Sequence, residues 1–121
     1  MFADQPPVPP RGNRSPRRMN PVERLEAALK ALASGEGQVV IHREVPWASI
    51  TFAGSRHELM LDFAGPEAVA AGERLIAALP DHEFAIPGQL VADATVSSVH
   101  HVMHPAPRMI VTATLLLLED A

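Results

Sequence analysis

Histidine is the residue type in this chain that most directly suggests chemistry. The 121-residue sequence contains six histidines, and three of them stand together in the segment His100-His101-Val102-Met103-His104. Imidazole is a common ligand of zinc, copper and nickel. Successive side chains of a β-strand point to opposite faces, however, so His100 and His101 cannot enter one coordination sphere if this segment is a strand. The sequence therefore predicts no metal site and no cofactor.

His57 and His100 are candidates for general acid–base chemistry, because the pKa of imidazole lies near working pH. The strand pairing expected below places both on the helix-facing side of the sheet. A catalytic histidine also needs an orienting carboxylate and a nucleophile, and no such set converges in that pairing. The simpler interpretation is that both histidines cap the core at the ends of hairpins. A pocket near His57 and His100, in a small-molecule-binding protein or an enzyme, is kept as the alternative.

The composition excludes several classes of function. The absence of cysteine excludes a disulfide scaffold, a thiolate zinc site and a cysteine nucleophile. Ten basic against fourteen acidic residues give a net charge of −4, which disfavours nucleic-acid binding. The apolar runs are far shorter than the roughly 18 residues of a membrane span. We expect a soluble, cytoplasmic protein, and the excess of arginine over lysine is typical of a GC-rich bacterial genome.

Charge and proline divide the chain into two parts. Residues 1–20 hold four arginines against one aspartate (+3), whereas residues 21–121 hold six basic and thirteen acidic residues (−7). The first part is rich in proline and poor in apolar side chains, so burial cannot offset the entropy lost on ordering. The sequence predicts a disordered Pro/Arg-rich tail over residues 1–19 and one α+β domain over residues 20–121.

Two helices are predicted from their start and stop signals. Asn20-Pro21 begins the first, with asparagine as the N-cap and proline at the first helical position, and the helix runs over residues 21–33. Its apolar positions recur every three or four residues. The second helix begins after Gly65 and ends at Pro80.

Strands fill most of the remaining sequence. Residues 38–43, 47–53 and 56–63 are predicted strands, with Gly54-Ser55 as a two-residue hairpin turn between the last two. Residues 90–103 and 108–118 form a second hairpin around a turn at 104–107. The order is αβββαββ. It predicts a two-layer α+β sandwich in which two helices cover one face of an antiparallel sheet of about five strands.

The face of the sheet opposite the helices, called here the open face, is predicted to bind a partner. Its candidate interface residues are Trp47, Met60, His101, Ile110, Leu116 and Leu118. The run of four leucines at 115–118 is typical of a strand that is buried on both sides. A second copy of the chain would cover Leu116 and Leu118. We therefore expect a non-catalytic binding module with an adaptor or chaperone-like role, which forms a homodimer and binds a protein or peptide partner through this face.

The element order, small size and acidic body resemble the architecture of type III secretion chaperones. The resemblance covers residues 21–118 and rests on element order alone. It implies a dimeric, non-catalytic protein that binds an unfolded segment of a secreted partner. The third helix of that family has no counterpart, because the chain ends at Glu119-Asp120-Ala121.

Overall fold

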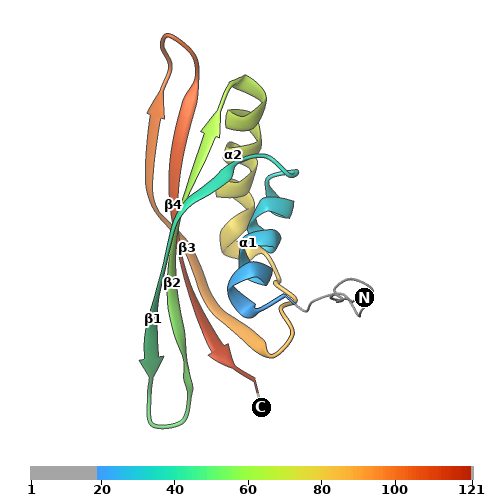
Figure 1. Cartoon of the computed structure of the whole chain (residues 1–121), viewed down its shortest axis with the longest axis vertical. Coiled ribbons are helices and arrows are strands. Elements are labelled where there is room, and N and C mark those ends of the chain that lie inside the picture. Colours follow the sequence, from blue (N-terminus) through green and yellow to red (C-terminus); the bar gives the residue numbers. More distant parts are fainter. Residues whose placement is uncertain (1–18, 121) are drawn as a thin grey trace, which may run out of the picture.

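The computed structural model describes residues 19–120, which form a four-stranded antiparallel sheet covered on one face by two helices (Figure 1). The elements are α1 (Pro21–Leu32), β1 (Gln38–Ala48), β2 (Ala53–Ala64), α2 (Pro66–Ala78), the short 3-10 helix η1 (Leu79–Asp81), β3 (Gln89–Val102) and β4 (Arg108–Glu119). The strand order in the sheet is β1-β2-β4-β3. The predicted α+β sandwich is confirmed, but the sheet has four strands and the element order is αββαββ.

Helix α1 begins as its sequence predicts. The Asn20 side chain accepts a hydrogen bond from the Glu23 backbone N–H at 2.8 Å, and the Glu23 side chain accepts one from the Asn20 N–H at 3.1 Å. This reciprocal pair satisfies two backbone donors that the first turn of a helix leaves free. At the other end, Ser34 and Gly35 adopt positive φ angles of 56° and 81° and terminate the helix.

Helix α2 lies close to the sheet because of one glycine. A Cβ atom at Gly72 would lie 2.6 Å from Met109 Cε and 2.9 Å from Phe63 Cδ2. Those two side chains come from β4 and β2, so the missing side chain lets the helix backbone approach both strands. The helix ends before Pro80, as expected.

The β1–β2 hairpin differs from the prediction. Residues 38–43 and 47–53 were expected as two strands, but Val45 and Pro46 continue a single strand, β1. A proline is tolerated there because β1 is an edge strand. The turn is at Ser49–Phe52, closed by a 2.7 Å hydrogen bond from Ser49 N to Phe52 O.

The predicted turn at Gly54-Ser55 is therefore wrong, and Gly54 has a different role. It lies within β2 beside β4, opposite Leu118. A Cβ atom at this position would collide with the backbone carbonyl oxygen of Leu117. Glycine is needed here for the close approach of two strands, and not for a turn. The displaced turn leaves Ile50 and Phe52, which were expected in the core, exposed at the hairpin tip.

The β3–β4 hairpin has the predicted strands but a different register. His101 lies opposite Met109 and His100 opposite Ile110, one residue away from the predicted pairing. Irregularities between Val91 and Asp93 and between Val96 and Ser98 shift the register further along β3. A shift of one residue exchanges the two sides of a strand, so the end of β3 near His100 presents the opposite sides from those expected.

The core lies between the helices and the sheet. Its fully buried large side chains come from both layers and include Leu25, Leu29, Leu59, Leu61, Phe63, Leu75, Val111, Leu115 and Leu117. The two hairpin turns lie at opposite ends of the elongated sheet (Figure 1). Within residues 19–120, no helix has both the length and the apolar character that crossing a membrane requires. The predicted disorder of the tail concerns residues that lie almost wholly outside the described range.

Candidate functional sites: a buried polar relay and the open face

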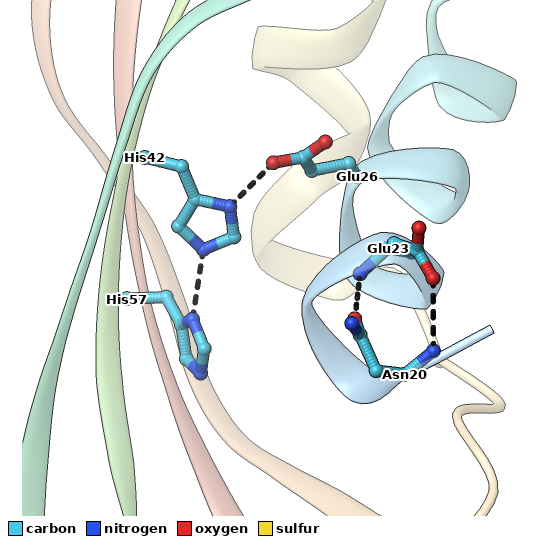
Figure 2. A network of polar contacts seen from close by, with 5 residues as sticks. All are labelled: Asn20, Glu23, Glu26, His42 and His57. Atoms are coloured by element: carbon cyan, nitrogen blue, oxygen red, sulfur yellow. Dashed lines mark hydrogen bonds and ion pairs between the residues drawn. The ribbon is translucent and has the colours of Figure 1, made fainter.

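Four polar side chains form a continuous chain of hydrogen bonds between α1 and the helix-facing side of the sheet. Glu26 Oε2 lies 2.6 Å from His42 Nδ1, and His42 Nε2 lies 2.9 Å from His57 Nδ1 (Figure 2). The remaining ring nitrogen of His57, Nε2, lies 2.8 Å from Ser55 Oγ. We call these residues, Glu26, His42, His57 and Ser55, the polar relay.

Three elements position the polar relay. Ser55 and His57 are two residues apart on β2 and therefore share a face. His42 on β1 lies opposite Leu59, which makes it a diagonal neighbour of His57 on that same face. Glu26 follows Leu25, whose buried side chain belongs to the stripe of α1 that packs on the sheet. Helix α1 thus places the Glu26 carboxylate beside His42.

The carboxylate of Glu26 sets the direction of every hydrogen bond in the polar relay. A carboxylate only accepts, so His42 Nδ1 must donate to it. The Nε2 atom of a neutral His42 then accepts, which requires His57 to donate from Nδ1. The Nε2 atom of His57 in turn accepts the hydroxyl proton of Ser55. In this assignment each imidazole nitrogen has one partner of the correct kind.

Burial keeps His57 neutral. The residue is only 1% exposed, and desolvation lowers its pKa below the ordinary value of 6.5. The Glu44 carboxylate, directly opposite on β1, raises this pKa, and His42 lowers it. A buried neutral imidazole with hydrogen bonds at both nitrogens can accept a proton from one side and pass one to the other.

The structure separates the two histidines that the sequence analysis placed near one pocket. His57 lies on the helix-facing side, opposite Leu115, whereas His100 lies on the open face, opposite Ile110, and is exposed. The predicted pocket between His57 and His100 is therefore wrong. The physical reason is the register of β3, which exchanges the sides of His100 and His101. Among residues 19–120, no group of three or more histidine, aspartate or glutamate side chains is arranged to hold a metal ion.

The open face carries five of the six predicted interface residues. Trp47, Met60, Ile110, Leu116 and Leu118 all lie on it by register. His101 does not, because it lies opposite Met109 on the helix-facing side. Leu118 is only 8% exposed in the single chain, so the predicted exposed pair of leucines is reduced to the half-buried Leu116. The interface role of these residues stays a prediction.

Polar contacts tie the strands together on the same face. Arg108 donates two hydrogen bonds to Asp62, at 3.0 and 2.6 Å, and these bonds hold the pKa of Asp62 below its usual value. A shallow cavity of about 240 Å³ lies among Ile41, Arg43, Glu58, Met60, Ser97, Ser98 and Thr112. The open face is thus a mixed apolar and polar surface with a hollow near its middle.

Sequence reasoning identified His57 but missed its three partners. With the turn placed at Gly54-Ser55, His57 was expected opposite Phe52, and His42 belonged to a separate strand. The actual register puts Glu44 opposite His57 and brings His42 within reach. The available signal in the sequence was the two-residue spacing of Ser55 and His57, which places both side chains on one face of a strand. This signal identifies a site only when the neighbouring strand β1, which carries His42, is correctly paired with β2.

Comparisons with known proteins extend the fold description. No protein-family model matches the chain, and no curated protein matches it at a significant level. The resemblance in element order to type III secretion chaperones is also not upheld, because two strands, and not three, separate the helices. One solved structure with a similar chain is the virion of a native gene transfer agent (GTA) particle. The similarity has a TM-score of 0.53 and 15% identity, covering 83% of this chain and 92% of that chain. At this identity the likeness shows a shared fold.

Proposed function

We propose that this chain is a binding module that associates with further copies of itself through the open face, without catalysis at that face, and with a homodimer as the smallest assembly. The observation that supports this function is that both helices lie on the other side of the sheet (Figure 1). The open face therefore has no cover within residues 19–120, although it carries several large apolar side chains. Ile41 is 40% exposed and Val45 58%, beside the half-buried Trp47, Ile110 and Leu116.

The energetics require that several of these side chains be buried together. Removing one leucine or isoleucine side chain from water is favourable by roughly 1.5–3 kcal/mol. Association costs at least several kcal/mol in lost translational and rotational freedom. These side chains are already partly buried, so each contributes only part of that value, and Ile41, Val45, Ile110 and Leu116 of both copies must be covered together to offset the cost.

The structural likeness supports the same function. The similar chain was solved within the virion of a gene transfer agent particle, which is an assembly of many protein subunits. A subunit of such an assembly binds other protein chains, as proposed here for the open face. A protein or peptide partner and a cytoplasmic location both stay predictions.

Sedimentation velocity over a range of concentrations tests the proposal. The wild-type chain should associate as its concentration rises, and Leu116→Asp should shift it to the monomer because the variant places a charge within the contact. Ala70→Asp is the matched control, since Ala70 is exposed on α2, away from the sheet.

Three results would contradict the proposal. The first is a wild-type chain that stays monomeric at high concentration. The second is an equal effect of Leu116→Asp and Ala70→Asp on association. The third is loss of the circular dichroism spectrum in Leu116→Asp, because this would show that Leu116 is needed for the fold itself.

A further inference from the structure

The polar relay ends at a surface cavity. Ser55 is half-buried, and together with Pro21, Glu44, Pro46, Gly54, Gln89 and Glu119 it lines a cavity of about 230 Å³. The two imidazoles of the polar relay are less accessible, since His57 is 1% exposed and the side chain of His42 is 9% exposed. A small molecule in this cavity would therefore meet the Ser55 hydroxyl first, with His57 Nε2 directly behind it, 2.8 Å from Ser55 Oγ.

The direction of the hydrogen bonds makes Ser55 a nucleophile. Its hydroxyl proton points to His57 Nε2, 2.8 Å away, and the Glu26 carboxylate holds the two histidines in the tautomers that this requires. We infer that Ser55 accepts acyl groups from carboxylic esters, with His57 as the general base and with His42 and Glu26 as positioning residues. This inference is independent of the proposed function, which uses the opposite side of the sheet.

The acyl transfer requires no reactant beyond the ester and water, and its protons move between Ser55, His57 and these two molecules. Ser55 Oγ forms a bond to the ester carbonyl carbon while its proton passes to His57 Nε2. The bond between that carbon and the alcohol oxygen then breaks, and the proton moves from Nε2 to the departing alcohol. Water then attacks the acyl carbon while giving a proton to Nε2, the bond from that carbon to Ser55 Oγ breaks, and the proton returns from Nε2 to Oγ as the carboxylic acid leaves. Glu44, opposite His57, stabilises the imidazolium that forms between these steps.

The lining of the cavity selects the substrate class. Glu44 and Glu119 bring two carboxylates to the same cavity as Ser55. They favour an ester whose alcohol part carries a positive charge.

A fluorophosphonate probe tests the nucleophile on the full chain. Attack by Ser55 Oγ forms an oxygen–phosphorus bond and expels fluoride, so the adduct is visible as a mass increase. We expect one adduct, located on Ser55 by peptide mapping and absent from Ser55→Ala. Ser97→Ala is the matched control, because the Ser97 hydroxyl donates to the Thr112 carbonyl and has no imidazole partner. No adduct, or an adduct on another residue, would overturn the inference.

The positioning role needs a measurement that a structural role would not affect. The labelling rate should rise with pH as His57 becomes neutral and then reach a plateau. Glu26→Gln keeps a hydrogen bond to His42 but no longer fixes its tautomer, because an amide can donate as well as accept. This variant should lower the plateau of the labelling rate about tenfold, whereas Glu26→Asp should restore much of the rate. An unchanged plateau in Glu26→Gln would refute the relay, even if His57 variants fail to fold.

The substrate class is tested with two acetyl esters, acetylcholine and its neutral analogue 3,3-dimethylbutyl acetate, in which a tert-butyl group replaces the trimethylammonium group. Hydrolysis of the cationic ester should be faster. Glu44→Gln should reduce the ratio of the two rates about fivefold, as expected for one charge pair in water. Equal rates for the two esters in the wild-type chain would show that the cavity does not select a cation.

Discussion

The imidazole rings of His42 and His57 lie edge to face on neighbouring strands, with ring centres 5.1 Å apart and a 2.9 Å contact between Nε2 and Nδ1. One added proton fits into this pair at His57 Nε2, because the imidazolium still donates from Nδ1 to His42 Nε2 and then donates from Nε2 to the Ser55 hydroxyl oxygen. A second proton does not fit, since two N–H donors would face each other. Because Glu26 of α1 is hydrogen-bonded to His42, the packing of α1 on the sheet is coupled to the protonation state of the His42–His57 pair.

The free energy of unfolding should fall on mild acidification. The pKa of His57 is lower in the folded chain than its ordinary value of 6.5, chiefly because of burial. Between these two pKa values the unfolded chain binds more protons, so stability increases with pH. The contribution of neutral His57 is complete above 6.5 and is lost as the pH falls through the folded-state pKa. Urea denaturation at about pH 7.5 and about pH 5.5 measures the difference.

Two variants separate this effect from the titration of carboxylates. His57→Gln should reduce the loss of stability between the two pH values, whereas His104→Gln, at an exposed loop position, should leave it unchanged. If His57→Gln is too unstable to measure, an NMR titration that follows the ring resonances of His57 in the wild-type chain measures the folded-state pKa directly. A midpoint at or above 6.5 would be inconsistent with the prediction.

Gly54→Ala should be strongly destabilising, and Gly72→Ala much less so. At Gly54 the added Cβ meets the β4 backbone, which can move only if two strands separate. At Gly72 the nearest atom is the end of the flexible Met109 side chain, and alanine also gains up to about 1 kcal/mol of helix propensity. We expect Gly54→Ala to cost more than about 2 kcal/mol in chemical denaturation. The opposite order of the two variants would mean that β2 and β4 are less closely spaced than described.

Substitution of Asn20, the N-cap of α1, should have a smaller effect on the free energy of unfolding. Asn20→Ala removes the acceptor for the Glu23 N–H and should lower the free energy of unfolding by about 1 kcal/mol. Asn20→Gly should cost only a few tenths of a kcal/mol, because glycine is a tolerated N-cap. Thermal denaturation of the two variants would show whether the capping contacts are made in solution, since equal losses would argue against them.

Chelation should leave the melting temperature unchanged. His100 and His101 lie opposite Ile110 and Met109, and thus on different sides of the sheet. Elemental analysis of the purified chain is the direct measurement. A stoichiometric metal that is lost in His100→Ala would require a different register at this end of β3.

The parts of the fold that depend on local chemistry could be predicted from the sequence. Asn20-Pro21 and Gly65-Pro66 mark the two helix starts because the N-cap and the first helical position have strong residue preferences. The two layers follow from the order of helices and strands. The period-two spacing of Leu59, Leu61 and Phe63, with Glu58 and Asp62 on the other side of the strand, also assigns the correct side of β2 to the core.

The remaining features depend on contacts between distant segments. Gly54 is a favourable turn residue by itself, and its role becomes visible only when β4 lies beside it. The irregularity between Val96 and Ser98 has no local signature, yet it decides which side His100 faces. The polar relay was missed because its members come from α1, β1 and β2, so that one misplaced turn separates His42 from His57.

The alternation along β2 has a consequence for how related sequences can differ. Ser55 and His57 belong to the polar relay, whereas Arg56 and Glu58 lie on the open face. An insertion or deletion of one residue in this strand would exchange the two surfaces at once. Point substitutions, in contrast, alter one surface and leave the other intact. We therefore expect homologues to keep the length of β2 strictly while they vary its residues, with length changes confined to the turn at Ser49–Phe52.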